Sequence, residues 1–158
     1  MPKEHFYQST ITWTGNNGTG TSHYTAYERS HSISIANKAT VAASSDPAFR
    51  GDRTKHNPEE LFLASISSCH MLWFLHLCSA EGIVVTKYKD QAFGTMEEAA
   101  NGSGHFVSVT LHPVVTVTKA EMISRANLLH AAANKMCFIA NSLNFDVNHE
   151  PITIAESD

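Results

Sequence analysis

The chain has 158 residues, a formal net charge of −4 at pH 7 and a composition that is 42% hydrophobic and 16% charged, which is ordinary for a globular protein. This acidic balance, with no cluster of Lys and Arg on any expected helix, argues against a nucleic-acid partner, because phosphate contacts need grouped cations. The length suits one hydrophobic core, and we expect residues 1–158 to form a single domain.

The N-terminal part of the chain predicts an antiparallel β-meander. Residues 6–13 (FYQSTITW) alternate and include Thr, Tyr and Trp, which favours a strand. Residues 14–20 (TGNNGTG) are typical of a turn, because Asn and Gly tolerate positive φ. Two further strands are expected around 22–28 and 32–43, and a polar loop over 44–56 follows them.

A long helix is expected next, with clear signals at both ends. Asn57 suits the N-cap, Pro58 suits the first helical position, and two glutamates, Glu59 and Glu60, lie beside the positive end of the helix. The helix should end near Ala80, where the sequence EGI supplies a glycine.

The apolar run 61–80 contains no Lys, Arg, Asp or Glu and is long enough to suggest a membrane span. Its polar side chains would lack partners in lipid, however: Ser65, Ser67, Ser68, His70, His76 and Ser79. We therefore expect a helix buried on most sides and no membrane association. The N-terminal sequence MPKEHFYQST has no apolar signal-peptide region, and three widely spaced cysteines do not suit a secreted disulfide framework, so a cytoplasmic location is expected.

The second half of the chain alternates strands and helices. Residues 83–97 and 104–118 predict two long antiparallel strands joined by a turn, and a second helix is expected from about Lys119 through the sequence AEMISRANLLHAAANK. The sequence CFIANSL at 137–143 is expected to begin a short further helix, and a closing strand follows. The predicted fold class is α+β.

Cys69 is a candidate reactive thiol, although a buried free cysteine is also common as inert packing. It lies about three turns into its helix, too deep for the helix terminus to stabilise a thiolate, so a cation must come from elsewhere. Arg50 and Arg53 lie in the loop before the helix. Glu59 is about 15 Å from Cys69 along the helix, so it cannot bond the thiol directly but can hold an arginine that folds back over it.

The other cysteines differ in their expected roles. Cys137 is a candidate partner for Cys69, because a thiolate is stabilised where a helix begins. Cys78 lies on the opposite side of the helix from Cys69, so we expect it to be a buried structural residue. A metal site is not expected, because His70 points away from the face shared by Cys69 and His76 and no HExxH or CxxC spacing occurs.

The sequence NPEELFLASISSC at 57–69 resembles the signature of the OsmC/Ohr family of hydroperoxide reductases. In that family Asn-Pro-Glu opens a central helix, and the peroxidatic cysteine follows ten residues after the glutamate. CFIANSL at 137–143 is similar to the segment with the second family cysteine. The resemblance covers essentially the whole chain and implies an OsmC-like α+β fold that forms an intertwined homodimer with two sites at the subunit interface.

The resemblance also implies roles for single residues. Cys69 corresponds to the peroxidatic cysteine, Cys137 to the resolving one, and Glu59 to the glutamate that positions an arginine against the thiolate. We favour Arg50 as that arginine, ahead of Arg53 and Arg29. The implied substrate is an organic hydroperoxide, which the thiol reduces to an alcohol through a sulfenic acid and a disulfide. No cofactor is implied, only an external dithiol such as a protein-bound dihydrolipoyl group.

Two residues depart from the family pattern. His70 follows Cys69 where many members have an aromatic residue, and Phe138 follows Cys137 where many have proline. These departures keep an alternative open, an OsmC-like dimeric binding module for an apolar ligand with little turnover. A general thiol–disulfide oxidoreductase is a third hypothesis, which the missing CxxC motif weakens.

Overall fold

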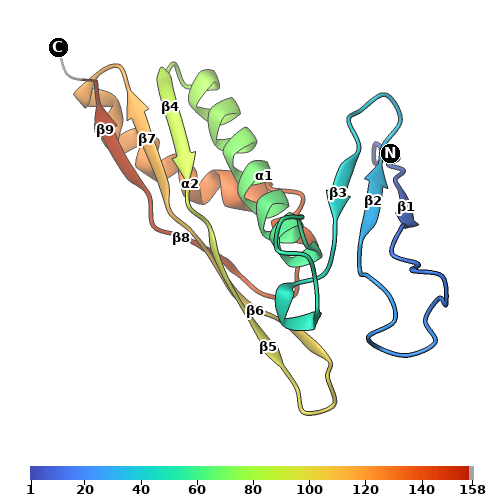
Figure 1. Ribbon diagram of the computed structural model, residues 1–158. Helices are drawn as coiled ribbons and strands as arrows, with labels where there is room; N and C mark the ends of the chain where they lie inside the picture. Colours follow the sequence, from blue (N-terminus) through green and yellow to red (C-terminus); the bar gives the residue numbers. More distant parts are fainter. Residues whose placement is uncertain (157–158) are drawn as a thin grey trace. The chain divides into compact units, whose positions relative to one another are not determined.

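The computed structural model describes residues 1–156, which fall into two compact units, residues 1–61 and the residues from 62 on (Figure 1). The first unit contains a three-stranded antiparallel sheet in the order β1-β2-β3, with β1 at Thr10–Trp13, β2 at His31–Ser34 and β3 at Val41–Ala43. A short 3-10 turn, η1 at Pro47–Phe49, lies in the polar loop that follows. The predicted antiparallel meander is therefore confirmed.

The boundaries of all three predicted strands in this unit were wrong, and the first strand begins at Thr10 and not at residue 6. Residues 22–28 form a loop in place of a strand, and the segment 32–43 is divided into β2 and β3 by a turn in which Asn37 has a φ of 63°. The loop is held at its base, where the Trp13 indole Nε1 donates to the Glu28 carbonyl at 2.9 Å. The alternation of polar and apolar residues in these short segments does not distinguish a strand from a loop. Polar side chains there can hydrogen-bond to the nearby backbone and stabilise a loop.

Helix α1 spans Pro58–Ala80, as the cap and stop signals predict. The Asn57 side chain accepts from the Glu60 amide at 2.9 Å, and the Glu60 carboxylate accepts from the Asn57 amide at 3.2 Å, which together form a capping box. At the other end Gly82 has a φ of 70°, and the amides of Gly82 and Ile83 donate to the carbonyls of Ser79 and Cys78. This pattern is a Schellman motif, which the glycine permits.

One stripe of α1 is buried, formed by Ile66, His70, Phe74 and Cys78 at intervals of four residues. Burial on most sides is not reached within the single chain, because Leu72 remains 62% exposed. By length and composition alone α1 is also long and apolar enough to cross a membrane, a property that core helices of soluble proteins share.

The second unit is built around a long hairpin that is broken at its middle. Strand β4 (Val85–Asp90) pairs with β7 (Pro113–Val117), and β5 (Phe93–Glu98) pairs with β6 (Gly104–Leu111), so each predicted long strand is two shorter ones. Asp90 holds the break, because its carboxylate accepts from the His112 amide at 2.7 Å and from the Ser67 hydroxyl at 2.5 Å. The same side chain therefore ties α1 to the sheet.

The C-terminal strands pair in parallel with the hairpin, which the sequence patterns did not predict. After the 3-10 turn η2 (Ala120–Met122), helix α2 (Ile123–Met136) returns the chain, so β8 (Val147–His149) runs parallel to β6 and β9 (Ile152–Ala155) runs parallel to β7. A strand that follows a crossover helix pairs in parallel for this reason. In Figure 1 α2 passes behind α1, and the two helices carry the residues described next.

Candidate active site: two thiols on two helices

Cys69 lies on the half-buried side of α1, next to its buried stripe. The capping box at Asn57 and Glu60 defines where the helix begins and so the direction in which each later side chain points. Cys69 carries a free thiol, as do the other two cysteines. A half-buried thiol can be reached by a small molecule and also packs against neighbouring side chains.

Cys137 does not begin a helix, which corrects the sequence prediction. It is the C-terminal cap of α2, with φ −66° and ψ 113°, and only a short 3-10 turn, η3 at Ala140–Ser142, follows. The negative end of a helix does not favour a thiolate. The amide of Ala140 does donate to the Cys137 sulfur at 3.4 Å, so the thiol is oriented by the turn after the helix.

The thiols of Cys69 and Cys137 are close enough in space for Cys69 to raise the pKa of Cys137, although the two residues are far apart in the sequence. Burial raises the pKa of Cys137 to about 11, and its contact with Cys69 acts in the same direction. Cys137 is only 1% exposed and stays protonated at neutral pH, whereas Cys69 is partly accessible. Two thiols in contact can form a disulfide, and the more accessible one meets an oxidant first.

An aromatic surface adjoins this pair. Trp73 lies one turn after Cys69 on the same side of α1 and packs edge-on against Phe138 at a ring distance of 5.5 Å. Leu72, Trp73 and His76 line a hollow of about 240 Å³ on this face. Phe138, which follows Cys137, is 67% exposed. An apolar molecule that reaches Cys69 can therefore bury its tail against this surface.

Glu59 and the candidate arginines belong to the 1–61 unit. One carboxylate oxygen of Glu59 is buried and has no hydrogen-bond partner among the described residues. Arg50 is exposed with a φ of 64°, and Arg53 is exposed as well; within residues 1–156 neither forms an ion pair. Contact between an arginine and the Cys69 thiol stays a prediction.

Arg29, the third candidate arginine, already has partners of its own. Its guanidinium donates to the carbonyls of Tyr27 at 2.6 Å and Tyr24 at 2.8 Å and lies over both tyrosine rings. Moving it to a thiol would break these contacts. The Arg50 guanidinium lies over the Tyr24 ring at a longer distance, 5.9 Å. Neither Arg50 nor Arg53 has a side-chain hydrogen bond within residues 1–156, so both are freer than Arg29 to take a new partner.

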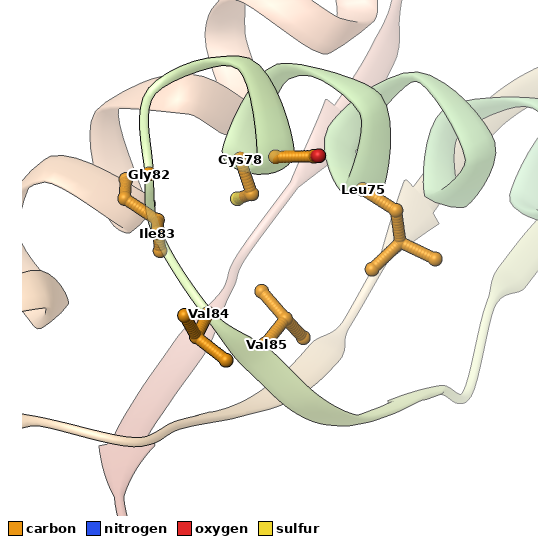
Figure 2. A pocket seen from close by; sticks show the side chains of 7 residues that line it. Leu75, Cys78, Gly82, Ile83, Val84 and Val85 are labelled. Carbon is orange, nitrogen blue, oxygen red and sulfur yellow. The ribbon is translucent and has the colours of Figure 1, made fainter.

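Cys78 is buried, as predicted for a structural residue. It lines a cavity of about 360 Å³ at the C-terminal end of α1, together with Leu75, Ile83 and Val85, and Figure 2 shows its thiol among these apolar side chains. Burial raises the pKa of Cys78 to about 11, and the nearby Glu81 charge adds to this. The Cys78 thiol therefore stays protonated in apolar surroundings.

A cluster of three histidines under α1 was missed by the sequence reasoning. The Nε2 atom of His70 lies 3.0 Å from the Nδ1 atom of His130, and His149 packs near both rings. His70 is 1% exposed and lies in the core. The sequence pattern could have indicated that His130 is buried as well, because it lies on the same side of α2 as the buried Ala126, Leu129 and Ala133.

The pKa of each histidine in this cluster is lowered. Burial lowers the pKa of His70 to about 4 and that of His130 to about 3, and the pKa of His149 is lowered for the same reason. Within the described residues 1–156, no group of three or more His, Cys, Asp and Glu side chains is arranged to hold a metal ion.

Comparisons with known proteins identify similar sequences and folds. The family model for OsmC-like proteins matches residues 51–151. An OsmC-like protein of unknown function from Vibrio cholerae has a similar structure, with a TM-score of 0.84, 28% identity and coverage of 94% of this chain and 100% of that one. No curated protein sequence matches the chain.

Two organic hydroperoxide resistance proteins share the fold. The one from Elizabethkingia anophelis has a TM-score of 0.69 at 18% identity and covers 96% of this chain and 100% of its own. OhrB of Bacillus subtilis has a TM-score of 0.62 at 20% identity and covers 92% of this chain and 98% of its own. At these identities the likeness establishes the fold alone.

Proposed function

Since the chain belongs to the OsmC-like protein family, we propose that it is a thiol-dependent peroxidase that reduces organic hydroperoxides to alcohols. The observation that supports this most directly is the contact between the thiols of Cys69 and Cys137, one accessible and one buried. Both thiols required for a two-cysteine cycle are then present in one chain.

In the proposed cycle the Cys69 sulfur attacks the distal oxygen of the hydroperoxide. The O–O bond breaks, the alcohol leaves with the proton, and Cys69 becomes a sulfenic acid. The Cys137 thiol then attacks the Cys69 sulfur, which forms the disulfide and releases water. Because Cys137 stays protonated at neutral pH, it does not compete with Cys69 for the peroxide and reacts only with the sulfenic acid beside it.

The disulfide is reduced by an external dithiol, which is oxidised to its own disulfide. We propose a protein-bound dihydrolipoyl group for this role, since its two thiols reduce a disulfide in one exchange sequence. All electrons in the cycle move between sulfur and oxygen atoms, so the proposed reaction needs no metal, haem or flavin.

Arg50 is proposed to stabilise the Cys69 thiolate, and Glu59 to hold Arg50 in place. The support is the buried Glu59 oxygen without a partner, because a buried carboxylate oxygen is costly unless a cation or donor pairs with it. The apolar face of α1, with Leu72 largely exposed, further supports a homodimer in which this face is covered.

The test is a free-thiol count and an intact mass before and after one equivalent of cumene hydroperoxide. We expect two thiols to be lost, the mass to fall by about 2 Da, and a Cys69–Cys137 peptide to appear in the digest. The Cys78→Ser variant is the matched control and should give the same result. Three unchanged thiols in the folded wild-type protein would refute the proposal.

A binding module is the second candidate, and the hollow beside Trp73 favours it. If the protein holds an apolar ligand without turnover, hydroperoxides will leave the thiols free while cumyl alcohol still changes the Trp73 fluorescence. Rapid thiol loss at Cys69 would count against this candidate.

A further inference from the structure

The His70–His130 pair joins the two helices that carry the two reactive thiols. His70 directly follows Cys69 on α1, and His130 lies two helical turns before Cys137 on α2. Their ring nitrogens are 3.0 Å apart, the residues are 60 positions apart in the sequence, and the ring planes are inclined by only 7°. Arg125 of α2 also donates to Glu81, one residue beyond the end of α1, but among the described residues the histidine pair is the side-chain hydrogen bond that joins the middle of the two helices.

The ring of His130 is held from several sides. The Phe74 ring, one turn after His70 on α1, stacks on it at 4.0 Å with an angle of 10°, and His149 of β8 lies 6.1 Å away. The edge contact to His70 sets the direction of the His130 ring, and the stack on Phe74 sets its plane. Together the hydrogen bond to His70 and the stack on Phe74 restrict both the distance between α1 and α2 and the rotation of α2 about its axis.

The two rings have only one hydrogen bond between them, and each has one further nitrogen without a partner. Nδ1 of His70 and Nε2 of His130 are buried and have no partner within residues 1–156. If His70 donates, its other nitrogen is an unused acceptor and the far N–H of His130 is an unused donor; if His130 donates, these roles exchange. Either tautomer leaves one buried donor and one buried acceptor unpaired, so two apolar side chains would suit the core better.

A disulfide has narrow geometric requirements. The two Cβ atoms must approach to about 3.8 Å with a torsion near 90°, so a small slide or rotation of α1 on α2 disfavours the bond. A directional hydrogen bond resists such a movement, whereas apolar packing alone allows side chains to adjust. We propose that His70 and His130 are positioning residues, whose hydrogen bond aligns α1 and α2 so that Cys69 and Cys137 can form a disulfide.

This inference rests on the proposed two-cysteine cycle, but it can be tested without any peroxide. In a glutathione buffer one oxidised glutathione converts the two thiols to the Cys69–Cys137 disulfide and leaves two reduced glutathiones, so electrons and atoms balance. The ratio of disulfide to dithiol protein, measured by acid trapping and mass spectrometry, gives an equilibrium constant. That constant reports alignment of the thiols and is independent of substrate binding.

We expect His70→Leu and His130→Leu each to lower this constant about tenfold, the effect of one lost buried hydrogen bond. Because they remove the same bond, the double variant should lose no more than either single variant. His149→Gln is the matched control, since His149 belongs to the same buried cluster but has no hydrogen bond to either partner. Its constant should stay within about twofold of wild type.

Amide variants keep the test sharp if the leucine variants fold poorly. A glutamine amide reaches the position of a histidine Nε2, and an asparagine amide reaches that of Nδ1. His70→Gln and His130→Asn should therefore retain the bond and the wild-type constant, while His70→Asn and His130→Gln should lose it. Thermal unfolding of the reduced forms establishes that all variants are folded.

Unchanged constants in folded His70→Leu and His130→Leu would overturn the inference. So would an equal loss in His149→Gln, because the role would then be general packing. A wild-type protein that forms the disulfide with glutathione but ignores hydroperoxides would refute the proposed function and leave this inference standing. A wild-type protein that forms no disulfide at any glutathione ratio would overturn both.

Discussion

The surroundings of Cys137 and Cys78 differ in one respect that decides their chemistry. Each thiol is 1% exposed, and burial raises the pKa of each to about 11. Cys137, however, contacts the thiol of Cys69, whereas Cys78 faces the apolar cavity between α1 and β4 (Figure 2). Burial and a raised pKa are common to both thiols, so only the neighbouring Cys69 makes Cys137 the candidate partner.

The largest effect is expected for the accessible member of the pair. Cys69→Ser should lower hydroperoxide consumption by at least about a thousandfold, because a hydroxyl is a far weaker nucleophile than a thiolate. The measurement is consumption of cumene hydroperoxide with a dithiol reductant in excess. Full activity in this variant would mean that another cysteine reacts with the hydroperoxide and that Cys137 is not distinguished by its contact with Cys69.

Cys137→Ser should lower the steady-state rate by about a hundredfold while the first turnover remains. The sulfenic acid on Cys69 has no thiol beside it in this variant, so it accumulates and can be trapped with dimedone and seen by mass spectrometry. If Cys78 replaced Cys137 in resolution, a Cys69–Cys78 disulfide would appear instead, which a regular α1 helix does not permit.

Arg50→Ala should slow the reaction of Cys69 with iodoacetamide and with hydroperoxide by about tenfold to a hundredfold, because a thiolate without a cation is less populated at neutral pH. Arg53→Ala is the matched control from the same loop. Equal losses in both variants would indicate a general effect of positive charge and would leave the choice of Arg50 unsupported.

Acid should expose a further difference between the buried thiols and the buried imidazoles. A protonated thiol is neutral, but a histidine that takes up a proton becomes charged in the core. The pKa of His70 is lowered from 6.5 to about 4, so the unfolded chain binds more protons and stability falls as the pH drops below about 6.5. From about pH 8 to pH 5 we expect His70 alone to lower the free energy of unfolding by about 2 kcal/mol, and His130, whose pKa is lowered to about 3, to add to that loss.

Urea unfolding of the reduced protein at several pH values measures this loss. His70→Gln removes the titrating imidazole, so its stability should depend less on pH over the same range. A wild-type stability that is flat between pH 8 and pH 5 would contradict the buried, neutral state of the cluster.

The smallest effect on activity is expected at Cys78. Cys78→Ala should leave the peroxidase rate within about twofold and lower the free energy of unfolding by about 1 kcal/mol, because it enlarges an existing cavity. The measurements are steady-state kinetics and urea unfolding. A large loss of activity with normal stability would mean that the Cys78 cavity participates in the reaction.

Sequence reasoning succeeded where the signals were local. Asn57, Pro58 and Gly82 located both ends of α1, because capping bonds involve residues only three to five positions apart. It failed at Cys137, where the helix expected to begin there is the end of α2 followed by one short turn. Apolar residues on both sides of position 137 allow either description, and only packing decides between them.

The candidate site was predictable in part for the same reason. A family motif singled out Cys69 and Glu59, and their spacing along one helix follows from helix geometry. The histidine cluster was not predicted, although His70 and His130 each occupy a buried helical stripe. A buried histidine in one helix does not reveal its partner in another.

The sequence by itself determined the long helix, the α+β class and the thiol that leads the proposed reaction, since these depend on short-range hydrogen bonds, periodicity and a contiguous motif. Only the tertiary structure decided that β8 and β9 pair in parallel, that Cys137 contacts Cys69 and that His130 lies against His70. The parallel pairings join residues 38 positions apart, and the contact between the two histidines joins residues 60 positions apart, so both depend on how helices pack on sheets and not on local sequence.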